Sequence, residues 1–277
     1  MARLRFTKWQ GTGNDFIVVD DRDGCFPSTN QRIVRHLCDR HFGIGSDGLI
    51  LIQAPRVEGT AYYMEFFNPD ASQSFCGNGS RCAFAFFSKL PQALPQGALP
   101  QELPQETLRS ELQRFTAIDG EHTAAWSDGL VSIGMRDVAG IQRIDDVMDF
   151  MHTGSPHLLV WVDDTEAIDI IPQARVHRYG PRFGAEGVNV SFLRCKDGHL
   201  EMRTYERGVE GETLSCGTGV TAAALSAIGR GHSGNTCDVR TRGGDLRVTA
   251  EAFGHGGFRS IFLAGPVGEV FTGEVEI

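Results

Sequence analysis

A short cysteine-glycine motif that occurs twice is the feature that most constrains the fold of this chain. Cys76 opens the stretch CGNGSRCAFAF, and Cys216 opens CGTGVTAAALS, 140 residues later in a chain of 277 residues. In both stretches glycines form a tight turn, and small apolar residues then continue as a helix. Several strand-like segments precede each motif. The same strand, turn and helix order in both halves predicts a duplicated chain with a central apolar helix in each half.

The remaining segments alternate between apolar strands and glycine-rich turns. We expect a helix over residues 30–40, capped by Ser28 or Thr29, and two strands around a tight turn in RFTAIDGEHTAAWSDGLVSIGM. The other expected strands are LRFTKW, FIVVD, LILIQA, YYMEFFN, HLLVWV, GVNVSFLR, HLEMRTYERG, DVRTRGG, DLRVTAEA, RSIFLAG and EVFTGEVEI. We therefore predict an α/β (α+β) fold with two pseudo-symmetric halves, in each of which strands wrap around the central apolar helix. The active site is expected in the cleft between the halves.

The expected division of the chain follows from the repeat. Residues 1–135 together with 264–277 form the N-terminal half, and residues 136–263 form the C-terminal half. Residues 90–106 read LPQALPQGALPQELPQE, a low-complexity repeat in which proline bars a regular helix or central strand. We interpret it as a surface insertion without chemistry. The alternative, a proline-rich ligand, lacks the basic flank that such ligands carry.

Composition excludes several classes of function. The net charge of −9 argues against a nucleic-acid partner, because few cations are available to neutralise phosphates. No run approaches the ~20 apolar residues that span a bilayer, and the first residues do not form a secretory signal. We therefore expect a cytoplasmic protein without a membrane partner that acts on a small molecule. The sequence leaves a homodimer open.

Cysteine usage argues against a disulfide framework and against a zinc site. The chain has seven cysteines, an odd number, with no CxxC pair and no cysteine near a His-x3-His pattern. There is no Walker motif and no evident context for a pyridoxal phosphate lysine, and GTGND is not the dinucleotide-binding fingerprint. We expect neither a metal nor a cofactor.

The C-G-x-G motif at a helix entrance carries chemistry of its own. A cysteine just before a helix lies at the positive end of the helix dipole, beside N–H groups that lack partners, and both effects favour the thiolate. The same N–H groups can bind a carboxylate. Two such motifs that face each other would hold one carboxylate with a base on either side. This arrangement suits inversion at the α-carbon of an amino acid, in which one thiolate removes a proton and the other thiol returns one.

At these motifs the sequence resembles the diaminopimelate epimerase family along nearly its whole length. The matching stretches are GTGNDFIVVD, RHFGIGSDG, FCGNGSRC, GSPH, GVNVSF, TYERGVEGET and SCGTG. The resemblance implies two pseudo-symmetric halves and an isomerase that needs neither pyridoxal phosphate nor metal. It also implies interconversion of LL-2,6-diaminopimelate and meso-diaminopimelate, on the route to lysine and peptidoglycan precursors.

The resemblance also assigns roles to individual residues. Cys76 and Cys216 are implied to be the two proton-transfer residues, and His157 and Glu206 are implied to tune the thiols. The backbone cradle for the reacting carboxylate is implied to consist of Gly77, Asn78, Gly217 and Thr218. The other implied substrate contacts are Asn14, Asn68, Asn189, Glu206 and Arg207, of which the arginine suits a distal carboxylate.

Three departures from the family pattern bear on substrate selectivity. Ser155 stands where the family usually has asparagine, and Gly48 stands where a polar side chain is common. The loop NPDASQSFC is one residue shorter than usual, with Ala71 in place of a glycine. The related proline and hydroxyproline racemases share the two-cysteine logic, but their substrates lack the distal polar end that the ERG and asparagine positions imply.

Two other classes of function remain open on the sequence. A thiol hydrolase would use one of the two cysteines with His157 as its base, and it would leave the duplication unexplained. A non-enzymatic amino-acid binding module would keep the double cradle but would not need two thiols.

Overall fold

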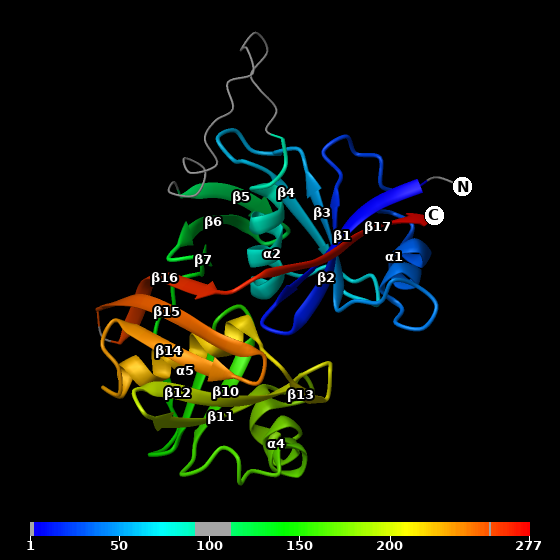
Figure 1. Cartoon of the computed structure of the whole chain (residues 1–277). Coiled ribbons are helices and arrows are strands. Elements are labelled where there is room, and N and C mark those ends of the chain that lie inside the picture. Colours follow the sequence, from blue (N-terminus) through cyan, green and yellow to red (C-terminus); the bar gives the residue numbers. More distant parts are fainter. Residues whose placement is uncertain (1–2, 92–111, 255) are drawn as a thin grey trace. The chain divides into compact units, whose positions relative to one another are not determined.

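The computed structural model describes residues 3–91, 112–254 and 256–277, and the chain divides into two compact units (Figure 1). Unit 1 comprises Met1–Ile133 and Pro266–Ile277, and unit 2 comprises Gly134–Gly265. The boundaries expected from the sequence, 135/136 and 263/264, lie two residues from these. Most of the LPQ stretch, whose placement on the surface is expected from composition, lies outside the described residues.

Unit 1 is a strand-rich body around one central helix. In the described part of this unit the helices are α1 (Gln31–Cys38) and α2 (Gly77–Phe87). Its strands are β1 (Arg3–Gly11), β2 (Asn14–Asp20), β3 (Gly48–Gln53), β4 (Tyr63–Phe67), β5 (Gln113–Ala117), β6 (Gly120–Ser127), β7 (Leu130–Gly134) and β17 (Gly268–Glu276). Along the sheet β17 pairs with β1, and β1 to β7 then follow in chain order. The pairs β2–β3 and β4–β5 are parallel, and the others are antiparallel.

Unit 2 has the same plan. Its helices are α4 (Ile170–Arg178), the 3-10 turn η1 (Pro181–Phe183) and α5 (Gly217–Gly229). Its strands are β8 (Gln142–Arg143), β9 (Met148–His152), β10 (Pro156–Trp161), β11 (Asn189–Lys196), β12 (His199–Glu206), β13 (Gly211–Thr213), β14 (Thr236–Thr241), β15 (Gly244–Phe253) and β16 (Gly257–Gly265). The sheet runs β8, β9, β10, β11, β12, β14, β15, β16, and β13 also pairs with β12. Here β10–β11 and β12–β14 are the parallel pairs.

The two units therefore repeat one pairing order. β1 to β4 correspond to β9 to β12, and β5 to β7 correspond to β14 to β16, with parallel pairs at the same two places. α1 and α4 each connect the strands of the first parallel pair, and α2 and α5 each connect those of the second. This confirms the predicted α+β class with two pseudo-symmetric halves.

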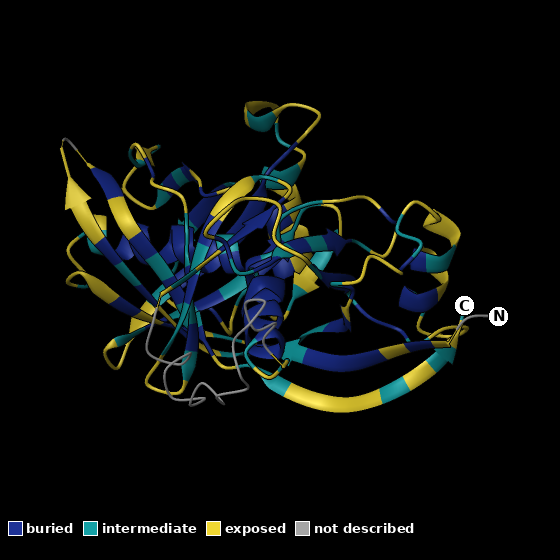
Figure 2. Ribbon diagram, turned by 90° about the horizontal axis from the view of Figure 1, so that it is seen from above, coloured by how far each residue is buried: buried dark blue, intermediate teal, exposed yellow. Residues whose placement is uncertain are grey.

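Both central helices are buried because apolar residues dominate them: alanine and other small residues in α5, and cysteine, alanine and phenylalanine in the second half of α2. Every residue of α2 is buried, and α5 is buried except at Thr218 and its last two residues. Figure 2 shows that buried residues concentrate in the strands and helices of the interior, whereas the loops are largely exposed. Each helix enters its core from a turn, which places the motif cysteine at the edge of that core.

Three local predictions were wrong. The first helix begins at Gln31, and its cap is Asn30, whose side chain accepts a hydrogen bond from the N–H of Arg32, rather than Ser28 or Thr29. The stretch predicted as two strands forms three, β5 to β7, because both DG sequences in it form tight turns. The elements absent from the prediction are α4, η1, β8, β9 and β13.

Candidate active site

Cys76 is the N-cap of α2, where extended backbone turns into the helix. Its φ and ψ are −128° and 111°, and its Sγ accepts a hydrogen bond from the N–H of Gly79 at 3.3 Å. The first N–H groups of a helix have no partner inside the helix and stand at the positive end of its dipole, which favours a bound anion. Gly79 is also required by packing, because a Cβ there would lie 3.3 Å from Ile50 and 3.4 Å from the Cβ of Cys76.

Asn14, at the start of β2, is the side chain that approaches Cys76 from the neighbouring strand. Its Oδ1 lies 4.0 Å from Cys76 Sγ and accepts a hydrogen bond from Asn78 Nδ2 at 3.4 Å. Asp47 orients this amide, because its Oδ2 accepts a hydrogen bond from Asn14 Nδ2 at 2.6 Å. The structure thus brings three of the predicted residues together. It adds Asp47, which sequence reasoning missed because an aspartate in a glycine-rich turn is commonplace.

Asn68 lies at the start of the loop that leads to Cys76. Its Nδ2 donates to the backbone oxygen of Ser72 and to Ser74 Oγ, both at 3.2 Å, so its amide fixes this loop. Ala71, at the position of the family's glycine, has a φ of 67°, a left-handed conformation that costs an L residue roughly 1–2 kcal/mol. Contact between Asn68 and a substrate stays a prediction.

Gly48 leaves no space for the polar side chain that is common in the family. A Cβ at this position would lie 2.4 Å from Cε2 of Phe66 and 2.9 Å from the backbone oxygen of Phe67. The ring of Phe66 therefore occupies the volume that a longer residue 48 would need. The glycine at position 48 therefore goes together with the phenylalanine at position 66 on β4.

Cys216 is the N-cap of α5, with φ and ψ of −124° and 110°, close to those of Cys76. Its Sγ lies 3.6 Å from Thr218 Oγ1, and that hydroxyl lies 2.9 Å from His157 Nε2. Thr153 Oγ1 donates to the backbone oxygen of Thr218 at 2.7 Å. His157, Thr218 and Cys216, all predicted from the sequence, therefore form one chain of polar contacts with the threonine in the middle.

Burial controls the state of His157. Its side chain is fully buried, and burial lowers its pKa from 6.5 to about 3, with further contributions from His152 and Arg207. The imidazole is therefore neutral at neutral pH. Gly219 allows this packing, because a Cβ there would lie 3.1 Å from His157 Cε1 and from Met202 Cε.

The remaining predicted residues of unit 2 gather at the starts and ends of β10 to β12. Asn189 uses both ends of its amide: Oδ1 accepts from the N–H of Arg207 at 2.8 Å, and Nδ2 donates to Ser155 Oγ at 2.8 Å and to the oxygen of Pro156 at 3.1 Å. Ser155, which replaces the family's asparagine, thereby holds Asn189. The neighbouring Glu206 accepts a hydrogen bond from the hydroxyl of Thr213 through Oε2 at 2.9 Å.

The four residues predicted as the carboxylate cradle lie in the first turns of the two central helices. Gly77 and Asn78 open α2, and Gly217 and Thr218 open α5. The structure thus groups the predicted site residues in two sets, one in each unit. Neither helix N-terminus holds an acidic residue in its first turn that would compete with a bound carboxylate.

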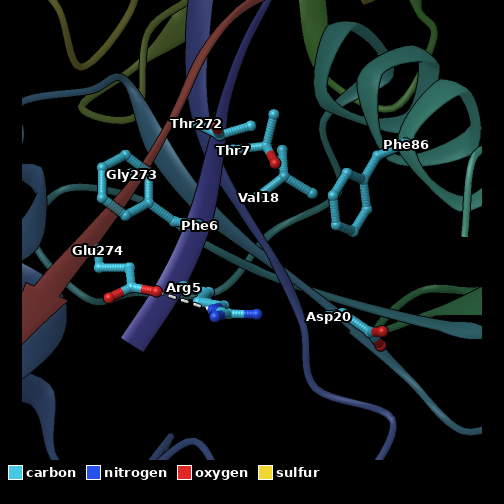
Figure 3. A pocket seen from close by; sticks show the side chains of 9 residues that line it. All are labelled: Arg5, Phe6, Thr7, Val18, Asp20, Phe86, Thr272, Gly273 and Glu274. Carbon is cyan, nitrogen blue, oxygen red and sulfur yellow. Dashed lines mark hydrogen bonds and ion pairs between the residues drawn. The ribbon is translucent and has the colours of Figure 1, made fainter. Parts of the chain in front are cut away.

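A separate pocket of about 610 Å³ lies in unit 1, and Figure 3 shows its lining. None of the predicted site residues lines it. The lining residues come from β1, β2, β17 and the end of α2, and an Arg5–Glu274 ion pair of 2.8 Å crosses part of it. Its residues are Arg5, Phe6, Thr7, Val18, Asp20, Phe86, Thr272, Gly273 and Glu274.

Over residues 3–91, 112–254 and 256–277, no three histidine, cysteine or carboxylate side chains are grouped so that they could hold a metal ion. No helix in the same ranges is long and apolar enough to cross a membrane.

Comparison with known proteins shows which family the chain is similar to. Residues 6–112 and 150–268 match the family model described as diaminopimelate epimerase. The diaminopimelate epimerase of Flavobacterium psychrophilum is 38% identical over 273 residues, which are 97% of this chain and 98% of the relative. That of a Hydrogenobaculum species is 35% identical over 98% of both chains.

The solved structures extend the likeness to the fold. A phenazine biosynthesis protein of the PhzF family from Bacillus anthracis has a TM-score of 0.66 at 14% identity and covers 100% of both chains. At this identity the likeness shows the fold and nothing further. The sequence relatives confirm the resemblance that the motifs indicate.

Proposed function

Since the chain belongs to the diaminopimelate epimerase family and is an isomerase, we propose that it interconverts LL-2,6-diaminopimelate and meso-diaminopimelate with two thiols. One thiolate takes the proton from the α-carbon, and the electron pair of the broken C–H bond spreads into the carboxylate. The other thiol then delivers its proton to the opposite face of the carbon. The carbon inverts: one face has lost a proton to the first thiolate, the other face has gained a proton from the second thiol, and no cofactor is consumed.

The observation that carries this proposal is the placement of both cysteines at helix N-caps with nearly the same backbone angles. Each helix start offers N–H groups that can bind the reacting carboxylate and stabilise the charge that develops on it. We propose that Gly77, Asn78, Gly217 and Thr218 form this cradle and that both motifs act on one substrate carbon.

The distal end of the substrate needs a separate set of polar groups. We propose that Arg207 grips the distal carboxylate and that Asn14, Asn68 and Glu206 bind other polar atoms of the substrate. Asn189 serves the same pocket by fixing the backbone of Arg207, because both ends of its amide are already engaged. A direct bond from an N–H of Asn189 to the substrate would replace its bond to Ser155 or to Pro156.

The surroundings of His157 disfavour the alternative of a thiol hydrolase. Such an enzyme needs a histidine that accepts a proton from the nucleophilic thiol near neutral pH. A pKa of about 3 makes His157 a weak base, and its ring contacts Thr218. We propose instead that His157 and Glu206 tune the thiols through their contacts.

The two diaminopimelate isomers belong to lysine and peptidoglycan precursor synthesis, which we propose to be this enzyme's role in the cytoplasm.

Solvent deuterium tests the reaction. In D₂O, wild-type protein should place deuterium at the α-carbon of LL-diaminopimelate and form the meso isomer, as followed by NMR and chiral chromatography. Cys76→Ala and Cys216→Ala should each abolish epimerisation, because one base cannot serve both faces. The exposed Cys25→Ala and Cys195→Ala are matched controls that should retain wild-type rates. Either site variant with more than a few per cent of wild-type activity would contradict the two-base mechanism.

A further inference from the structure

One cation lies inside the apolar core that surrounds α2. Arg81 is five residues after Cys76 and has an exposed fraction of 0%. Its Nη2 donates to Thr12 Oγ1 at 3.1 Å, whereas its Nε and Nη1 have no hydrogen-bond partner in the described part of the chain. A buried charge is normally paired, because removing it from water is costly. A guanidinium with a single neutral partner therefore calls for an anion.

The guanidinium lies against the glycine turn that precedes Asn14. A Cβ added to Gly11 would lie 3.4 Å from Arg81 Nη2 and 3.2 Å from the backbone oxygen of Asn78, in the first turn of α2. The charge is therefore placed beside the end of the helix that carries Cys76.

The ionisable groups that act on Arg81 leave one candidate for the anion. Burial lowers the pKa of Arg81 to about 10, so it remains a cation at neutral pH, and the charges that act on it belong to the thiols of Cys82 and Cys76. Burial raises the pKa of Cys82 to about 12, which keeps it a neutral thiol. Cys76 is the partly exposed member of the pair.

The corresponding position in unit 2 is neutral. Five residues after Cys216 stands Thr221, a buried residue whose hydroxyl donates to the backbone oxygen of Gly217 at 3.0 Å. The nearby His157 is neutral as well. The pseudo-symmetry of the fold therefore breaks in the charge beside each motif: the first helix has a buried cation where the second has a hydroxyl.

We propose that the Arg81 guanidinium is the counter-charge of a Cys76 thiolate, so that Cys76 is the resting base and Cys216 the resting acid. This assignment rests on the proposed two-thiol reaction. Arg81 acts as a positioning residue, through Cys76 and without touching the substrate. It explains how a fully buried cation is tolerated in α2, because the thiolate at the helix N-cap neutralises it.

Other charged groups on the elements around α2 have partners of their own, so they do not compete for this role. β3 has no ionisable side chain. The charged groups on or beside β1, β2, β4 and β6 pair as follows: Arg3 and Arg5 with Glu274, Lys8 with Asp15, Asp20 with Arg22, Asp47 with Arg40, Glu65 with Gln53 and Gln73, Glu121 with Arg114, and His122 with Asp119. Burial raises the pKa of Tyr62, so this phenol stays neutral.

The test measures the titration of Cys76 directly. The full chain is alkylated with iodoacetamide between pH 5 and 10, and the rate at each cysteine is read by mass spectrometry of its peptide. In the wild type, Cys76 should titrate at a lower pH than Cys216. Arg81→Met removes the charge at similar volume and should raise the Cys76 midpoint by about one pH unit or more, which slows alkylation at pH 7 roughly tenfold. The Cys216 midpoint should not move.

Two further variants separate charge from structure. Arg81→Lys keeps the charge and should move the Cys76 midpoint less than Arg81→Met does. Thr12→Val removes the neutral hydrogen bond of Arg81 but not its charge, so it should leave the midpoint near that of the wild type.

A wild-type Cys76 that titrates at or above Cys216 would overturn the assignment whether or not the variants fold. An Arg81→Met protein with an unchanged midpoint and a raised KM would also overturn it, by assigning the charge to the substrate. Alkylation needs no turnover, so the two failures are distinguishable: a chain that fails to epimerise diaminopimelate refutes the proposed function, whereas the Cys76 midpoint decides whether Arg81 stabilises the thiolate.

Discussion

At the scale of single residues, burial gives His157 a measurable link between pH and stability. Its pKa is about 3 in the folded protein and near 6.5 in the unfolded chain. Between these values the unfolded chain binds a proton that the folded chain does not, so stability falls as the pH falls. We expect this residue to lower the free energy of unfolding by up to about 1.4 kcal/mol per pH unit over that range.

Urea unfolding of the wild type and of His157→Gln at several pH values between 4.5 and 8 measures this effect. At pH 8 the wild type should be the more stable protein, because the substitution disturbs a packed site. Its advantage should shrink as the pH falls, since the glutamine does not titrate. A difference between the two proteins that is the same at every pH would show that His157 is not held neutral by burial.

The hydroxyl of Thr218 lies between His157 and Cys216, and a valine at this position removes the hydroxyl but keeps the shape of the side chain. Thr218→Val should lower kcat/KM on the order of tenfold, because it leaves His157 Nε2 without its partner and removes the hydroxyl 3.6 Å from Cys216. Thr218→Ser keeps the hydroxyl and should stay within a few-fold of wild type. Steady-state kinetics with LL-diaminopimelate checks both. Equal losses in the two variants would assign Thr218 a packing role.

The sequence predicted the residues that form these contacts, but it could not predict which contacts they make. Cys76, Asn14 and Asn78 lie in short glycine-rich motifs, so their proximity could be expected from the motifs. Asp47 and Arg81 lie in motifs of the same kind, but an aspartate in a turn and an arginine within a helix are ordinary residues, so the pattern does not single them out. Their roles depend on burial, which is a property of the folded chain.

At the scale of elements, α5 is fixed at its end by a buried ion pair with β9. Asp149 is fully buried and accepts hydrogen bonds from Ser226 Oγ at 2.6 Å and from Arg230 Nε at 2.7 Å. Removing one partner of a buried pair leaves the other charge uncompensated, which typically costs about 3–5 kcal/mol. We expect Asp149→Ala to destabilise the protein by about this amount in urea or thermal unfolding.

A double variant distinguishes the unpaired charge from the lost packing. Asp149→Leu combined with Arg230→Met removes both charges, so it should recover a substantial part of the stability that Asp149→Ala loses. If the double variant is less stable than Asp149→Ala, the charges themselves are not the cause. In that case the contact of Arg230 with the ring of Trp161 is the more important interaction at this end of α5.

Physical reasons explain why some helices and strands were not predicted from the sequence. α4 contains Pro172, which reads as a helix breaker, but the proline stands in the first turn, where its missing N–H is not needed. Asp128 and Gly129 both have positive φ, as the tight hairpin turn between β6 and β7 requires, and this turn adds the strand that was missed. β8 has two residues, too few for a periodic pattern.

At the scale of the whole molecule, the repeated pairing order places each motif cysteine at the same point of the same topology. Each lies at the entrance of the helix that connects the second parallel pair of strands. The sequence signals this repeat through the motifs, because buried helices need small apolar residues and their entrances need glycine. The sequence shows Arg81 in one motif and Thr221 in the other, but it does not show that both are buried beside the motif cysteines' helices.

Oxidation provides a whole-molecule test of whether the two thiols serve one carbon. A base reacts when its atom lies about 3–3.5 Å from its target, so two sulfurs on opposite faces of one carbon are separated by roughly twice that distance. Without substrate, a shift of a few ångströms would allow a disulfide, whose Cα atoms lie about 4.4–6.8 Å apart.

We therefore expect a mild oxidant to form a Cys76–Cys216 disulfide and abolish activity, and dithiothreitol to restore it. Peptide mass mapping without reductant identifies the bond, and a chain with Cys25→Ala and Cys195→Ala should behave in the same way, because those exposed thiols are not involved. Activity that survives oxidation, or a loss that dithiothreitol does not reverse, would argue that the two thiols do not approach one substrate carbon.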